Sequence, residues 1–285
     1  MAQPHPNQPR EPARELRPAW SLPAGASADI TLPVEWPGEM TREWAWGDST
    51  GKGVRVCILD SGVDAEHPYV GVVQQAVAVS LGPDGEAVVA DDTEGDLCGH
   101  GTACAGIVRA LAPDCELTSV RVLGAGFTGS GDILLAGLRW AVEQGFDVVN
   151  MSLSTTKRQF AGILHELTDR AYFQRTVLVA SAHNMPVESY PWRFSSVISV
   201  GSHEEPDAMT FYSNPDPPVE FFARGVDVEV AWTGGARIRR SSSSRAASTS
   251  SWRGWAARRS ARRATALRRR TSPESARSCA PSIRS

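Results

Sequence analysis

The sequence predicts an α/β fold in which helices cover both faces of a mainly parallel β-sheet. Three observations predict it: short apolar runs rich in β-branched residues, helical repeats between those runs, and polar residues where the runs end. Alternation of such runs with helical segments is typical of βαβ units, which build parallel sheets. The carboxyl ends of these strands meet at one edge of the sheet, and we expect the chemistry to lie there.

Five segments have the character of buried strands, because each is a short, largely apolar run bounded by turn-forming or charged residues. They are residues 54–59, 117–123, 147–153, 176–181 and 196–202. Two segments between them repeat apolar residues at helical spacing, residues 131–145 and residues 161–173. The first of these ends at Gly145, and glycine is a common C-terminal stop signal for a helix.

Composition divides the chain into three parts. Residues 1–40 are polar and proline-rich and predict a loosely ordered arm. Residues 41–235 carry the strand and helix patterns and predict one large domain. In residues 236–285, Arg, Ser and Ala occupy 37 of 50 positions, with 14 Arg and one acidic residue, and we expect disorder. This last part has a net charge of +13, against −16 for the first 235 residues.

Composition also sets expectations about compartment and partners. Neither a signal-peptide core nor an apolar run long enough for a membrane span occurs, so we expect a cytoplasmic protein that does not enter membranes. The five cysteines fit free thiols in that compartment. Because no Cys-x-x-Cys pair is present, we expect no metal site, and nothing indicates a cofactor. We expect a monomer.

Three polar residues stand next to predicted strands or at the start of a predicted helix. Asp60 ends the run 54–59, His100 lies between two glycines before a small-residue segment, and Asn184 follows the run 176–181. Each has an ordinary structural interpretation taken singly: a turn-capping Asp, a hydrogen-bonded loop His and a turn-forming Asn. Each also has a chemical one: a carboxylate that orients a partner, a general base and an oxyanion donor.

Taken together, the three blocks resemble the subtilase family of serine peptidases. The resemblance is carried by VRVCILDSGVDAEHP around Asp60, GHGTACAG around His100 and VLVASAHN around Asn184. Further similar segments are VRVLGAGFTGSG, GLRWAVEQGFDVVNMSLS, FSSVISVGS and VEFFARGVDV. The likeness covers roughly residues 41–235.

The resemblance implies a three-layer, subtilisin-like α/β fold and an Asp–His–Ser triad that hydrolyses polypeptides. Asp60 would orient His100, His100 would move the proton of the serine, and Asn184 would stabilise the oxyanion. An extended peptide would add as a strand between two cleft segments. The substrate-binding residues implied by the resemblance are Leu123, Gly124, Gly129, Ser130, Gly131, Ser152, Leu153 and Ser154.

The family's Gly-Thr-Ser block, which carries the nucleophile, is missing after Gly235. Three explanations compete. A natural basic tail could bind nucleic acid, with Trp252 and Trp255 stacking on bases. A diverged site could use Ser250. A frameshift in GC-rich DNA would replace the family sequence with an Arg-, Ser- and Ala-rich one.

We favour the frameshift, and we do not expect nucleic-acid binding. The chain as written is then incomplete at its C-terminus and inactive as a serine endopeptidase. The alternative is a non-catalytic pseudoenzyme or remnant that keeps a peptide-binding cleft. Because the nucleophile's helix crosses the core of the resembled fold, its loss predicts exposed apolar sheet surface and low stability.

Overall fold

The computed structural model describes residues 42–183, 185, 187–207, 209–214, 218–233 and 237–242. The chain divides into two compact units, the first ending at Asp48 and the second beginning at Ser49. The described part of the first unit contains a single short helix, α1 (Arg42–Ala45). All other described elements belong to the second unit, which contains the blocks that predict chemistry.

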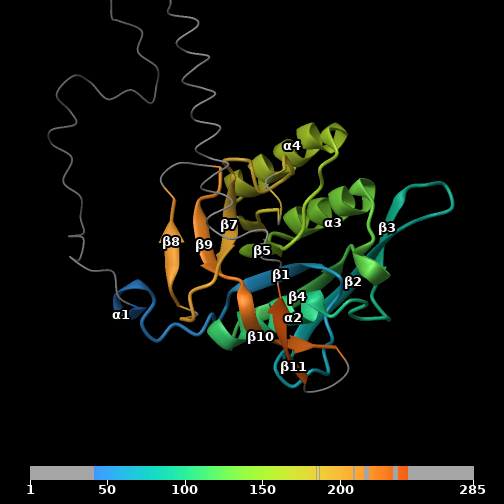
Figure 1. The fold of residues 1–285 in the computed structure, drawn as a ribbon. Coiled ribbons are helices and arrows are strands. Elements are labelled where there is room, and N and C mark those ends of the chain that lie inside the picture. The colour runs from blue at the N-terminus through green and yellow to red at the C-terminus, as the bar shows by residue number, and fades with distance from the viewer. Residues whose placement is uncertain are drawn as a thin grey trace, which may run out of the picture. The chain divides into compact units, whose positions relative to one another are not determined.

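The second unit is built on a nine-stranded sheet in the order β3-β2-β4-β1-β5-β6-β7-β9-β8. Its strands are β1 (Arg55–Asp60), β2 (Val73–Leu81), β3 (Ala87–Asp91), β4 (Glu116–Arg121), β5 (Val148–Met151), β6 (Val177–Ser181), β7 (Val197–His203), β8 (Phe211–Ser213) and β9 (Phe221–Arg224). Seven neighbouring strands, β2-β4-β1-β5-β6-β7-β9, pair in parallel. The two edge strands, β3 and β8, pair antiparallel with β2 and β9. The predicted, mainly parallel sheet is confirmed, and Figure 1 shows it with β8 at one edge and β3 at the other.

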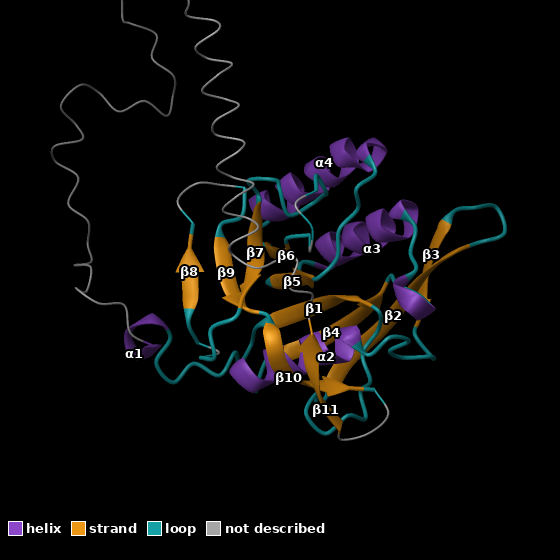
Figure 2. Cartoon of the chain, viewed as in Figure 1, coloured by secondary structure: helices purple, strands orange, loops and turns teal. Residues whose placement is uncertain are grey.

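Helices cover the two faces of the sheet, as Figure 2 shows. Helices α3 (Gly131–Gln144) and α4 (Ala161–Phe173) pack on one face, and α2 (His100–Leu111) packs on the other. Strand β1 shows why both faces are apolar. Cys57 and Leu59 join the α3–α4 core, while Val56 and Ile58 join the α2 core, because successive strand side chains point to opposite faces.

The ends of α3 follow from local sequence. The Ser130 hydroxyl accepts a hydrogen bond from the backbone N–H of Ile133 at 3.2 Å, which satisfies one N–H group of the first turn. At the other end Gly145 adopts the left-handed conformation with φ 66°, as predicted for a helix stop. The predicted range 161–173 coincides with α4.

A two-stranded antiparallel ribbon follows the sheet, made of β10 (Val226–Trp232) and β11 (Arg237–Ser242). Strand β10 packs against α2. Strand β11 takes the first residues of the Arg/Ser/Ala-rich segment that begins at residue 236. Strand pairing uses backbone groups, which an arginine-rich strand offers as well as any other.

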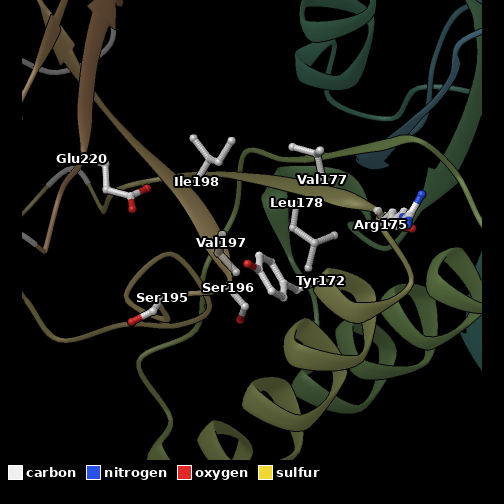
Figure 3. Close-up of a pocket in the computed structure, with 10 residues that line it drawn as sticks. Tyr172, Arg175, Val177, Leu178, Ser195, Ser196, Val197, Ile198 and Glu220 are labelled. Atoms are coloured by element: carbon white, nitrogen blue, oxygen red, sulfur yellow. The ribbon is translucent and has the colours of Figure 1, made fainter. Parts of the chain in front are cut away.

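One apolar part of the sheet is open to solvent. Val177 of β6 and Ile198 of β7 are 42% and 38% exposed, and both point away from the face that α3 and α4 cover. Near them, at the amino ends of β6 and β7, lies a cavity of about 310 Å³ (Figure 3). Its lining includes Tyr172, Arg175 and Glu220.

Since parallel strands place their carboxyl ends at the opposite edge, this cavity is remote from Asp60.

No helix in the described part of the chain has the length and apolar character that a membrane crossing requires.

Candidate active site

Asp60 and His100 form the centre of the site. Asp60 is the last residue of β1 and is fully buried, and His100 is the first residue of α2. The Nδ1 atom of His100 lies 2.8 Å from Oδ1 and 2.9 Å from Oδ2 of Asp60. Asp60 Oδ1 also accepts the backbone N–H of Ser61 at 2.8 Å. The structure thus joins two residues 40 positions apart, in the arrangement of a base and its orienting carboxylate.

The environment of His100 favours its charged form. The hydrogen bond to Asp60 and the contact with Cys104 raise the pKa of His100 well above its ordinary value, although burial opposes the shift. The side chain stays 36% exposed, so a ligand can reach the ring. The ring of Phe127 meets the imidazole edge-on, with centroids 5.9 Å apart. Phe127 has φ 60°, a strained backbone conformation for a bulky residue.

A carboxylate that sequence reasoning missed, Asp96, ties the two halves of the site together. Its Oδ1 accepts hydrogen bonds from the Ser61 hydroxyl at 2.7 Å and from the backbone N–H groups of Cys98 and Gly99 at 2.9 and 2.8 Å. Its Oδ2 accepts the backbone N–H and the hydroxyl of Thr102 at 2.8 and 2.6 Å.

Asp96 therefore replaces the side-chain cap that α2 lacks, since its N-cap residue is Gly99. It also holds the start of α2 to the turn after Asp60. Asp96 also forms an Asx turn, because its side chain accepts the backbone N–H groups of Cys98 and Gly99, two and three residues later in the chain. An Asp in a turn is the only sequence feature that points to this role.

Replacing Asp96 with Ala is expected to lower the free energy of unfolding by about 3 kcal/mol or more, because five donors lose a charged acceptor. Chemical denaturation measures this change. The matched control is Asp84→Ala, which removes one 3.2 Å bond in an exposed turn, and for it we expect a change within about 0.5 kcal/mol. Equal effects of the two substitutions would show that Asp96 does not hold the site together.

The first predicted cleft segment follows β4. The backbone N–H of Leu123 donates to the carbonyl of Asp60 at 3.1 Å, so this segment begins beside the site. Gly124 and Thr128 form an antiparallel bridge that closes a short loop carrying Phe127. The Cys98 thiol fastens this loop, since it donates to the Gly124 carbonyl at 3.2 Å and accepts the Phe127 N–H at 3.4 Å.

The glycines of this segment have neighbours of their own. A side chain at Gly129 would contact Leu123, and one at Gly131 would overlap the ring of Phe160. Gly131 is the first residue of α3 and follows its capping residue, Ser130. The structure thus shows packing partners for positions that the resemblance assigned to substrate binding.

The second predicted cleft segment, Ser152–Leu153–Ser154, follows β5. The Ser152 hydroxyl accepts a hydrogen bond from Asn150 Nδ2 at 3.3 Å and lies 3.6 Å from the Sγ of Cys104. The next residue, Thr155, forms an antiparallel bridge with Tyr190. The two segments follow β4 and β5, the direct neighbours of β1, so they flank Asp60 on both sides.

Two predicted site residues lie outside the described residues, namely Asn184 and Ser250. Their roles as oxyanion donor and as weak nucleophile candidate stay predictions. Among the described residues, the donor set best suited to a metal ion combines Asp60, His100 and Cys104, whose ligand atoms lie within 4.8 Å of one another.

An α/β domain with a buried aspartate hydrogen-bonded to a partly exposed histidine at the carboxyl edge of its sheet has the arrangement found in hydrolases that use an Asp–His–Ser triad. Comparison with known proteins gives the family. The sequence model of the subtilase family matches residues 51–265. The chain is 33% identical over 207 residues to the minor extracellular protease Epr of Bacillus subtilis, and 34% identical over 193 residues to subtilisin DY of Bacillus licheniformis. The chain belongs to the subtilase family.

These alignments cover only part of each relative. They take in 67% of this chain and 30% of Epr, and 62% of this chain and 66% of subtilisin DY. Among solved structures, the S41 psychrophilic protease has a TM-score of 0.55 at 24% identity, covering 68% of this chain and 74% of its own. A cold-adapted subtilisin-like serine proteinase has a TM-score of 0.50 at 24% identity, covering 69% and 72%. Both likenesses support the predicted three-layer, subtilisin-like α/β fold.

Proposed function

We propose that this chain carries the substrate cleft and the Asp–His half of a serine endopeptidase, and binds polypeptides without hydrolysing them. The observation that carries the proposal is the 2.8 Å contact between Asp60 and His100, in a chain that contains no Gly-Thr-Ser sequence. The pair can hold and move a proton. The attacking hydroxyl, which would form the bond to the peptide carbonyl, is the part that the sequence lacks.

The strand order supports a polypeptide as the ligand. Strand β1 lies between β4 and β5, and the segments 123–131 and 152–154 continue from these neighbours on either side of Asp60. An extended peptide between them would satisfy its backbone groups by pairing with one or both segments. The exposed rings of His100 and Phe127 would contact the peptide's side chains.

Two measurements on the 285-residue chain test the proposal. We expect a fluorophosphonate probe to leave the chain unlabelled, because no activated serine is present. We expect a fluorescein-labelled unfolded polypeptide, reduced and carboxymethylated casein, to bind and remain intact. Cleavage of the casein, or a fluorophosphonate adduct on any residue, would contradict the lack of catalysis.

A matched pair of substitutions locates the binding. Ser154→Trp places a large ring in the second cleft segment and is expected to weaken casein binding at least about tenfold, which corresponds to about 1.4 kcal/mol. Ser80→Trp adds the same ring on the exposed end of β2 and is expected to leave binding unchanged. Equal binding by the two variants would place the polypeptide elsewhere.

The cytoplasmic location and the monomeric state stay predictions.

A further inference from the structure

We propose that Asp60, His100 and Cys104 form a binding site for one Zn²⁺ ion at the centre of the cleft. His100 and Cys104 are four residues apart on α2, so their side chains lie on the same face of the helix. Asp60 faces them from the end of β1. Each residue offers one ligand atom, and the three atoms lie within 4.8 Å of one another.

The donor set selects the metal. Zn²⁺ prefers thiolate, imidazole and carboxylate ligands, and sites with three protein ligands keep a fourth position open. Calcium and magnesium prefer oxygen ligands alone, so a thiolate and an imidazole disfavour them. In a site with one of each ligand, the ion's two positive charges are balanced by the thiolate and the carboxylate. The site is therefore neutral, which suits the complete burial of Asp60.

The distances are close to those of such a site. The Nδ1 atom of His100 lies 2.8 Å from the nearer carboxylate oxygen of Asp60 and 3.9 Å from the Sγ of Cys104. Tetrahedral zinc ligands of these types are separated by about 3.3–3.6 Å, as their bond lengths dictate. Movements of about half an ångström would bring Nδ1 to these separations from the carboxylate oxygen and from Sγ, and all three ligand atoms already lie within 4.8 Å of one another. The partly exposed ring of His100 leaves a route for the ion.

Zinc would take the place of the proton between Asp60 and His100. On binding, the Cys104 thiol loses its proton, and Nδ1 of His100 gives up the proton that it donates to Asp60. Both protons go to solvent, and the ion forms one bond to each of the three ligands. The Ser152 hydroxyl, 3.6 Å from Sγ, is placed to donate a hydrogen bond to the thiolate. The ion and the Asp60–His100 hydrogen bond are therefore mutually exclusive.

The amino-acid sequence did not predict this site. Its prediction of no metal rested on the absence of a Cys-x-x-Cys pair, whereas this cluster depends on a carboxylate 40 residues before the histidine. The zinc site does not depend on the proposed function, because it needs neither a nucleophile nor a bound peptide.

Titration of the full chain with Co²⁺ tests the proposal, since cobalt bound to a thiolate has a charge-transfer band in the near ultraviolet. We expect one Co²⁺ per chain, this band, and its loss when Zn²⁺ is added. Cys104→Ala should abolish the band and weaken Co²⁺ binding by more than about 100-fold. Cys115→Ala, the matched control, removes a buried thiol outside the cluster and should keep the band and the Co²⁺ affinity.

A second readout needs no substitution, so it holds even if a variant fails to fold. We expect Zn²⁺ to slow alkylation of Cys104 by iodoacetamide at least about tenfold, as measured by mass spectrometry of the unsubstituted chain. Alkylation of Cys98 should keep its rate. Failure to bind Co²⁺, an unchanged spectrum in Cys104→Ala, or unprotected alkylation of Cys104 would overturn the proposal.

Discussion

Restoring the reading frame after the codon for Gly235 will produce a chain that hydrolyses peptides, whereas the 285-residue chain will not. We expect one of the two other frames to encode Gly-Thr-Ser followed by small residues. The gain in kcat is expected to be about a millionfold, the amount that loss of the serine from a subtilisin triad costs. The reason is that Asp60 and His100 already lie 2.8 Å apart, so a serine hydroxyl delivered beside His100 would complete the triad.

Gene sequencing and an assay of the corrected chain on a chromogenic peptide measure this effect. The control is His100→Ala in the corrected chain, which should remove the activity and the fluorophosphonate labelling together. Two findings would refute the frameshift. One is a gene that encodes no Gly-Thr-Ser in either frame, and the other is a corrected chain that folds and stays inactive.

The strands that sequence patterns predicted are those that lie between helices in the middle of the sheet. Strand β1 was predicted within one residue at each end and α4 without error, because burial on one or both faces produces strong apolar patterns. The antiparallel edge strands β3 and β8 were missed, as was β2 beside β3. All residues of β8 and most of β3 are exposed, so burial does not constrain their sequence.

The site, too, contains residues that the sequence predicted and residues that it did not. Asp60 and His100 were predicted to act together, and their hydrogen bond agrees with that prediction. Asp96 was not recognised as part of the site, and Cys104 was expected to be a free thiol. Three of the five donors to Asp96 are backbone N–H groups, which every residue except proline presents, so no partner residue type identifies them. The contact of Cys104 with His100 follows from their spacing of four residues on α2, whereas its approach to Asp60 depends on the distance between a strand end and a helix, which no local pattern contains.

Gly101→Ala is a substitution that we expect to move His100 away from Asp60. Gly101 is the second residue of α2, and a Cβ atom there would overlap the carbonyl oxygen of Gly62 and lie 3.3 Å from the Cβ of Asp60. Because the overlap is with backbone, the start of α2 must move away from β1. We expect a loss of about 3 kcal/mol in the free energy of unfolding, at the upper end of overpacking effects.

The same movement must lengthen the contact between His100 and Asp60, so the low-field NMR signal of the proton between them should disappear. Gly162→Ala is the matched control, since Gly162 is the second residue of α4, is exposed, and has no atom within 4 Å of an added Cβ. There we expect a gain of about 0.5–1 kcal/mol, because alanine is the better helix former. A Gly101→Ala chain as stable as the Gly162→Ala chain, with the low-field signal intact, would show that close packing of α2 on the Asp60 turn does not set the geometry of the pair.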